Sequence, residues 1–322
     1  MTGASFVEGL SMSTTTATLS VADLRLLAKS SWVLALRADH RSPATIAAYS
    51  EGVRLYLDWC EREEVDPLSR VALRAWVASL LDRGQAPTTG KSRMQAVRRF
   101  AAWLVAEGEI PGDPFTGIKP PKMDRKMVDP LSDDQLRALI RACTPPKGAA
   151  PLGQLTARRD EAILRLMSEG LLRAGEVVAL TVADIDLAGG SALVRRGKGG
   201  KARRVPFGPQ TARAIDRYLR LRRHHRLADS PDLWLGDHGH KLAYEGLYKS
   251  LRGRAQAAGV EGFHPHLLRH TGAHRWLAAG GSEQSLMAIA GWERPDMLAT
   301  YTRARASDRA AEEARRLNLG DL

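Results

Sequence analysis

Apolar residues recur at helical spacing through the first third of the chain. Ser42 and Pro43 form a helix start, because Ser is a favoured N-cap and Pro is accepted at the first helical position. A second amphipathic run covers residues 71–81, and a third begins near Thr89. The apolar positions of the first run are Ile46, Tyr49, Val53, Leu57 and Cys60. This pattern predicts an all-helical domain over residues 21–110.

The helical pattern stops at Ile110, and residues 111–130 are rich in proline. Proline-rich sequence without apolar periodicity is typical of a semi-extended linker. Lys119 and Lys122 make this stretch basic. We therefore expect a linker that also follows a phosphate backbone.

Helical spacing resumes at Leu131, and Ser132 to Gln135 fits a capping box. Residues 191–194 and 204–207 resemble strands on either side of a glycine-rich turn, which predicts a hairpin. Helices are expected at residues 163–172, 210–227, 243–258, 265–279, 283–290 and 295–316. The second domain, residues 131–322, is therefore predicted to be mostly α with a small antiparallel β-sheet. No internal repeat is apparent.

Among the compositional features, net charge adds to this predicted fold an indication of the binding partner. The 322 residues carry a net charge of +12, whereas 44% hydrophobic and 26% charged residues are ordinary values. A basic balance favours a polyanionic partner, most often nucleic acid. On charge alone, a protein that is merely basic is an equally good interpretation.

Cysteine usage and hydropathy indicate the compartment. Cys60 and Cys143 lie in apolar helical patterns without metal-ligand spacing, so we expect buried thiols. No window approaches the roughly 18 apolar residues of a membrane helix. Residues 1–20 are rich in Ser and Thr and lack the features of a secretory signal, so they are expected to form a disordered tail. These features favour a cytoplasmic, nucleoid-associated protein that does not engage a membrane.

Five side chains carry candidate chemistry on a DNA phosphodiester. Arg173 and Arg269 supply guanidinium groups, which match phosphate geometry bidentately and keep their charge. His266 lies three residues before Arg269, so one helical face presents both. Lys198 lies in a glycine-flanked turn, where it can reach the leaving 5′ oxygen as a general acid. Tyr301 would be the nucleophile.

Ionising Tyr301 is the costly step. A phenol with a pKa of about 10 costs about 4 kcal/mol to ionise at pH 7. Two guanidiniums can offset most of this cost, and His266 can act as the proton acceptor because its pKa lies near working pH. Each residue also has a plain interpretation: Arg173 as a surface charge, Lys198 as part of a solvated basic hairpin, Tyr301 and Trp292 as packing. Their combination in this order makes those interpretations improbable.

The motifs that contain these residues resemble those of the tyrosine recombinase (phage integrase) family. Residues 170–176 read Gly-Leu-Leu-Arg-Ala-Gly-Glu, and residues 197–206 read Gly-Lys-Gly-Gly-Lys-Ala-Arg-Arg-Val-Pro. Residues 266–271 read His-Leu-Leu-Arg-His-Thr, and residues 290–292 read Ala-Gly-Trp, with Tyr301 nine residues after Trp292. The resemblance spans about residues 22–305, in the simple two-domain form without an arm-site-binding domain.

The resemblance implies a fold and a role for each residue. The expected fold is a helical, SAM-like core-binding domain and a catalytic domain, closed as a C-shaped clamp on DNA. Arg173 and Arg269 would hold the scissile phosphate, and Lys198 would protonate the leaving hydroxyl. Tyr301 would form a 3′-phosphotyrosine beside His266. Two further positions complete the set: Trp292 where many members have His, and Glu176 as a residue that orients its neighbours.

The resemblance also implies partners. Double-stranded DNA with an inverted-repeat core site would be bound by a homotetramer in the synaptic complex and by a monomer or dimer off DNA. Strand exchange through a Holliday junction would need no metal, cofactor or ATP, and accessory proteins are unknown. The expected DNA contacts are Lys91, Arg93, Arg98, Arg99, Lys119, Lys122, Arg195, Arg196, Lys201, Arg203 and Arg204.

Two other classes of function stay open on the sequence. One is a catalytically silent DNA-binding accessory factor on the same fold, and the other is relaxation of supercoils like a type IB topoisomerase. Within the family, integration or excision of a phage or mobile element and resolution of dimers are alternatives; Trp292 favours the mobile-element role. Residues 84–92 resemble a phosphate-binding loop, but they follow a helix and have one residue too many.

Overall fold

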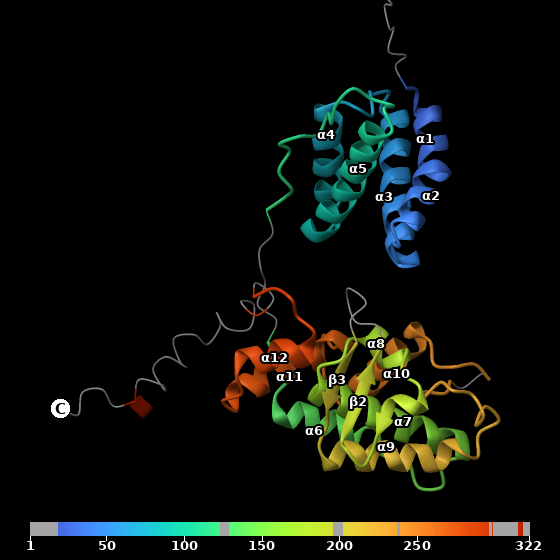
Figure 1. Ribbon diagram of the computed structural model, residues 1–322, viewed down its shortest axis with the longest axis vertical. Coiled ribbons are helices and arrows are strands. Elements are labelled where there is room, and N and C mark those ends of the chain that lie inside the picture. The colour runs from blue at the N-terminus through green and yellow to red at the C-terminus, as the bar shows by residue number, and fades with distance from the viewer. Residues whose placement is uncertain are drawn as a thin grey trace, which may run out of the picture. The chain divides into compact units, whose positions relative to one another are not determined.

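The computed structural model describes residues 19–122, 129–195, 202–236, 239–295, 298 and 315–317. Its contacts divide the chain into two compact units, residues 1–126 and 127–322 (Figure 1). Each unit has its own hydrophobic core. No helix among the described residues is long and apolar enough to cross a membrane.

The first unit is a bundle of helices, as the apolar spacing predicted. Ser42 caps the third helix, because its hydroxyl accepts a hydrogen bond from the Thr45 N–H at 3.1 Å, and Pro43 is its first residue. The helix that begins at Pro87 includes residues 87–92 of the stretch that resembles a phosphate-binding loop. The helices are α1 (Val21–Lys29), α2 (Ser31–Ala38), α3 (Pro43–Arg62), α4 (Arg70–Asp82) and α5 (Pro87–Ala106).

Aromatic side chains fill the core of the first unit. The rings of Tyr56 and Trp76 lie 5.0 Å apart, and the Tyr56 hydroxyl donates to the Pro67 carbonyl at 2.8 Å. Phe115 and Ile118, from the stretch predicted as a linker, are buried in the same core. The beginning of this stretch therefore belongs to the first unit. Burial of the two apolar side chains lowers the free energy of the folded state, which exposure in a linker would not do.

The second unit places helices around a three-stranded antiparallel sheet, which confirms the mostly α class. The strands β1 (Ile185–Asp186), β2 (Ser191–Val194) and β3 (Arg203–Pro206) follow one another in that order, with Leu193 opposite Arg204. β1 was not predicted. The helices are α6 (Asp133–Arg141), α7 (Pro151–Gly170), α8 (Ala174–Val178), the 3₁₀ turn η1 (Val182–Asp184), α9 (Pro209–Arg222), α10 (Tyr244–Ala257), α11 (Pro265–Ala278) and α12 (Glu283–Ala290).

Helix α7 packs against both α9 and α11 and is buried along much of its length. The sequence predicted a helix only over residues 163–172, whereas α7 begins at Pro151. The missed turns contain Arg159, Asp160 and Glu161, which are buried although charged. Asp160 accepts hydrogen bonds from Ser250 at 2.7 Å and Arg254 at 2.9 Å. Because paired charged residues take buried positions here, the apolar residues do not recur at helical spacing, and that spacing was the basis of the prediction.

The end of α7 sets up the turn that leads into α8. Leu171 adopts a left-handed conformation with φ of 54° and ψ of 30°, so the helix ends at Gly170. The predicted helix through Leu172 was wrong here, because a left-handed residue turns the chain away from the helix axis. Gly272 of α11 lies directly against this turn, near Leu171 and the Ser168 carbonyl.

The close approach of α11 to α7 leads to a stability prediction for Gly272→Ala. A Cβ at residue 272 would lie well inside contact distance of the Ser168 carbonyl oxygen, so we expect a loss of about 1–3 kcal/mol of unfolding free energy. Gly253→Ala in α10 is the matched control, because its Cβ would meet open space. It should stabilise the helix by about 0.5–1 kcal/mol. Urea unfolding followed by circular dichroism measures both, and a Gly272→Ala protein as stable as wild type would contradict this packing.

Candidate active site

Arg269 lies at the centre of the site and is 1% exposed. Its guanidinium donates to two backbone carbonyls, that of Leu171 and that of Ala290, the second at 2.7 Å. The left-handed conformation of Leu171 makes the first contact possible, since the chain leaves α7 at that residue. One side chain of α11 therefore joins the end of α7 to the end of α12.

Arg173 follows on the same turn, as the N-cap residue of α8. Its backbone N–H and its side-chain Nη1 donate to the two carboxylate oxygens of Glu176, each at 2.8 Å. The Arg173 side chain is 27% exposed, whereas that of Glu176 is only 6% exposed. Glu176 therefore fixes Arg173 from the protein side and leaves part of the guanidinium accessible.

Arg203 of β3 binds the same carboxylate. Its Nη1 and Nη2 donate to Glu176 at 3.0 and 2.7 Å, and its Nε donates to the Ile289 carbonyl at 2.8 Å. The sequence predicted a DNA contact at Arg203, but its side chain is 11% exposed and its guanidinium faces protein groups. A buried carboxylate needs cationic partners, and Arg203 is one of them.

Glu176 is ionised through these contacts. Burial alone would raise the pKa of its carboxyl group. Hydrogen bonds from Arg203, and then from the backbone and side chain of Arg173, outweigh burial and hold the pKa below its ordinary value of 4.5. The carboxylate thus keeps its negative charge between two arginines at neutral pH.

His266 lies in the first turn of α11, one turn before Arg269. Loss of contact with bulk water lowers the pKa of its imidazole, and the positive charges of Arg269 and Arg173 lower it further. The side chain nevertheless remains accessible at the surface. At neutral pH the ring is therefore neutral and able to accept a proton.

Trp292 follows α12 after Gly291, which adopts a left-handed conformation with φ of 63°. The Trp292 ring is 6% exposed and lies 5.3 Å from the Arg269 guanidinium carbon, a cation–π contact. It packs in a small core formed by the ends of α7, α11 and α12. The structure thus brings together Arg173, Glu176, Arg269 and Trp292.

Four predicted residues lie outside the described residues. These are the proposed general acid, the proposed nucleophile and two DNA contacts: Lys198, Tyr301, Arg196 and Lys201. The hairpin that carries Lys198 in the sequence is described on both sides. Arg195 on one side donates to Asp184 at 2.5 Å, and Arg204 on the other donates to the Ser191 hydroxyl at 3.0 Å.

The sequence did not predict Asp184 as the partner of Arg195 at the end of β2. It is 4% exposed and accepts hydrogen bonds from the backbone and hydroxyl of Thr181 at 2.9 and 2.7 Å, in addition to Arg195. The Thr181–Asp184 pair has the spacing of a cap, which is the signal that could have found it. The carbonyls of Leu171, Ile289 and Ala290 were also missed, since backbone groups leave no residue signature.

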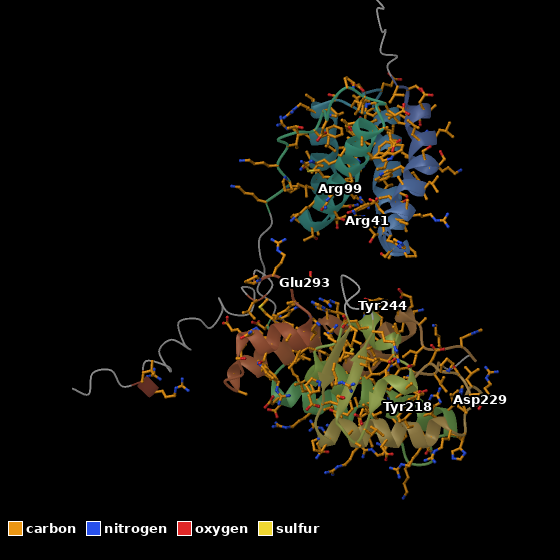
Figure 2. The ribbon with its side chains drawn as sticks, viewed as in Figure 1. Arg41, Arg99, Tyr218, Asp229, Tyr244 and Glu293 are labelled. Carbon is orange, nitrogen blue, oxygen red and sulfur yellow. The ribbon has the colours of Figure 1, made fainter. Side chains whose placement is uncertain are left out.

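Four of the predicted DNA contacts of the first unit, Lys91, Arg93, Arg98 and Arg99, lie on α5. Lys91, Arg98 and Arg99 line a hollow of about 340 Å³. Arg99 also lines a second hollow with Arg41, and both residues are labelled in Figure 2. Arg93 donates to the Gln85 side chain at 2.7 Å. Lys119 and Lys122 are exposed.

Such a site can bind and polarise a phosphodiester. Two guanidiniums held by fixed protein groups provide donors that need no reorganisation when charge develops on phosphate oxygens. A neutral imidazole one turn from Arg269 can accept a proton.

Comparison with known proteins identifies the class. The chain matches the phage integrase family over residues 130–308 and the phage integrase N-terminal SAM-like domain over residues 30–108. It is 32% identical to tyrosine recombinase XerC of Chromobacterium violaceum over 263 residues, which covers 81% of this chain and 85% of the relative.

Two solved structures share the fold. The Tn1549 transposon integrase in complex with transposon right end DNA has a TM-score of 0.66 and 19% identity, covering 92% of this chain and 99% of that one. The XerH site-specific recombinase bound to palindromic difH substrate, a post-cleavage complex, has a TM-score of 0.67 and 17% identity, covering 91% of this chain and 84% of that one.

The fold and the arginine-rich site therefore define an enzyme of DNA strand breakage, and the chain belongs to the phage integrase family. Within that family it is a site-specific tyrosine recombinase, which cleaves and rejoins DNA.

The environment of His266 leads to a prediction for its titration. The imidazole of His266 should titrate below 6.5 in the DNA-free protein, and Arg173→Met should move the midpoint upward by removing a positive charge. Because the folded pKa lies below the unfolded one, the unfolded chain binds more protons, and His266 lowers stability as pH falls through 6.5. Histidine NMR, assigned with His266→Gln, measures both midpoints. A midpoint at or above 6.5 would contradict the site's electrostatics.

Proposed function

We propose that the chain cuts DNA by transferring a backbone phosphate to Tyr301, which leaves a 3′-phosphotyrosine and a free 5′ hydroxyl. The observation that carries the proposal is that Arg173 lies on the turn after α7 and Arg269 of α11 donates to the Leu171 carbonyl of the same turn, so that protein acceptors hold both arginines there. Two guanidiniums held at one turn can bind the non-bridging oxygens of a single phosphate.

Each residue has one role in the proposed reaction. Arg173 and Arg269 bind the non-bridging oxygens, and His266 takes the phenolic proton as Tyr301 attacks the phosphorus. The bond from phosphorus to the 5′ oxygen breaks, and Lys198 supplies the proton to that leaving oxygen. Rejoining reverses these steps, with a 5′ hydroxyl as nucleophile and Tyr301 as the leaving group. Trp292 keeps the Arg269 guanidinium in place through the contact of its ring.

The charges of the site lower the cost of forming the phenolate. That cost is about 4 kcal/mol at pH 7 for a phenol with a pKa of about 10. Each charge-assisted contact to phosphate contributes about 1.5–3 kcal/mol, and more when it strengthens in the transition state. Arg173 and Arg269 together therefore supply stabilisation of the required size.

The covalent intermediate explains how strands are exchanged without ATP. A phosphotyrosine conserves the energy of the broken bond, so one protein can join the strand to a new partner. We propose that four protomers hold two inverted-repeat sites and pass through a Holliday junction. The XerH recombinase, whose fold this chain shares, is solved in a post-cleavage complex with a palindromic substrate, which supports cleavage at an inverted-repeat site.

The basic surface of the first unit supports a DNA-binding role for α5. Lys91, Arg98 and Arg99 lie on one helix and line one hollow, so they can contact phosphates of the same DNA backbone. Lys119 and Lys122 extend the positive charge along the chain. These contacts would supply affinity, whereas the target sequence depends on groove contacts and DNA shape.

The biological role is proposed to be recombination at one core site, as in integration or excision of a mobile element or resolution of dimers. Curated relatives named XerC and the fold shared with a transposon integrase support a recombinase of this kind. A catalytically silent factor would bind DNA without a covalent complex. A topoisomerase-like enzyme would relax supercoils without joining a second duplex.

A nicked suicide substrate tests the chemistry with a matched pair of variants. Wild-type protein should become covalently attached to DNA fragments that contain its site, and Tyr301→Phe should form no covalent complex, because the nucleophilic oxygen is gone. Tyr244→Phe is the control, since Tyr244 is 49% exposed at the start of α10 (Figure 2). It should react like wild type. A covalent complex formed by Tyr301→Phe would sink the proposal.

Binding measurements test the role of α5. Arg99→Ala should weaken binding to all DNA sequences alike and reduce the salt dependence by about one counterion, because a phosphate contact is lost. Arg74→Ala on α4 is the control, since Arg74 is exposed in the same unit and lines neither hollow around Arg99. Fluorescence anisotropy at several salt concentrations gives both slopes. Equal slopes for the two variants would remove Arg99 from the interface.

A further inference from the structure

We propose that Arg203 is a positioning residue for DNA cleavage, which fixes Arg173 relative to the end of α12 through Glu176 and the Ile289 carbonyl. The inference rests on the proposed function, since it concerns how the phosphate-binding arginine is held. It assigns Arg203 a role inside the protein, in place of the DNA contact that its basic surroundings in the sequence predicted.

Two guanidiniums bridge the same two stretches of chain. Arg269 of α11 joins the Leu171 carbonyl to the Ala290 carbonyl, and Arg203 of β3 joins Glu176 to the Ile289 carbonyl. Residues 171–176 carry Arg173, and residues 289–292 lead to Trp292. Arg203 therefore provides a second, independent connection between these stretches.

The geometry of Arg203 leaves it poorly suited to contact DNA. Its Nε, Nη1 and Nη2 all donate to protein acceptors at 2.7–3.0 Å, and its side chain is 11% exposed. The chain at Gly291 lies directly over it, since a Cβ there would stand 3.3 Å from the guanidinium carbon. A planar fork with acceptors on three nitrogens is fixed in one orientation.

Sharing Glu176 also controls the charge that Arg173 presents. Glu176 accepts two hydrogen bonds from Arg203 and two from Arg173, so its negative charge is divided between two cations. Without Arg203 the whole carboxylate charge would act on Arg173. Its guanidinium would then be held more tightly on Glu176 and would offer less positive charge to a phosphate.

The test compares Arg203→Met and Arg203→Lys with Arg213→Met. Arg213 is exposed on α9, so its variant removes one positive charge outside the site. DNA affinity is measured by anisotropy on a duplex carrying the site. The cleavage rate is measured with the suicide substrate at saturating DNA, and folding is followed by circular dichroism and thermal unfolding.

We expect Arg203→Met to bind DNA as tightly as Arg213→Met does and to cleave about 100-fold more slowly, the effect of a displacement of roughly 1 Å at a reacting group. Arg203→Lys should cleave at an intermediate rate, because an ammonium can pair with Glu176 but lacks the planar fork. In a Glu176→Gln background, Arg203→Met should add little further loss, since both changes break the same connection.

Three results would overturn the inference. Cleavage at saturating DNA equal to wild type, with weaker binding, would make Arg203 a DNA contact. Full, multiplicative loss in the Glu176→Gln background would separate Arg203 from Glu176. Restoration of the rate by a substrate with sulfur at the leaving 5′ position would place its effect on leaving-group protonation instead of on Arg173.

The same set of variants distinguishes failure of this inference from misfolding and from failure of the proposed function. If Arg203→Met does not fold, Arg203→Lys decides alone: slower cleavage at unchanged affinity supports the inference, and wild-type cleavage overturns it. If wild-type protein forms no covalent complex, the proposed function fails and this inference fails with it. If wild type and Arg203→Met cleave equally, only this inference fails.

Discussion

A buried guanidinium holds the site together. Arg269 is 1% exposed, and an isolated buried cation is costly, so the chain must bring acceptors to it. It does so with backbone carbonyls from the ends of α7 and α12. Leu171 adopts a left-handed conformation that brings its carbonyl to Arg269. Packing of α11 against α7 and placement of the Arg269 guanidinium are therefore coupled.

The three arginines of this site differ in how far protein groups occupy their guanidiniums. Arg203 binds protein groups throughout, Arg269 binds carbonyls while facing the Trp292 ring, and Arg173 keeps a partly exposed side chain. Glu176 stays ionised because the hydrogen bonds of two arginines outweigh its burial. The preorganised donors of such a site stabilise developing charge without rearrangement, which is the main source of catalysis in many enzymes.

The sequence predicted the elements whose signals are local. The Ser42 cap, the capping box at Ser132 and the pairing of β2 with β3 follow from neighbouring residues, and the structure contains them. The first turns of α7 escaped prediction because Asp160 and its neighbours are buried charges satisfied by distant partners. For the site, motif order predicted Arg173, His266 and Arg269, and the structure places His266 one turn before Arg269 on α11. The role of Arg203 could not be predicted, because its partners lie 27 and 86 residues away.

The central claim is that Arg173 and Arg269 grip one phosphate, which becomes bonded to Tyr301. A crystal structure of the covalent complex trapped on a suicide substrate tests it most directly. We predict guanidinium nitrogens of both arginines within about 3.2 Å of the non-bridging oxygens of the phosphate on the Tyr301 oxygen. A phosphate attached to another residue, or one contacted by neither arginine, would contradict the account.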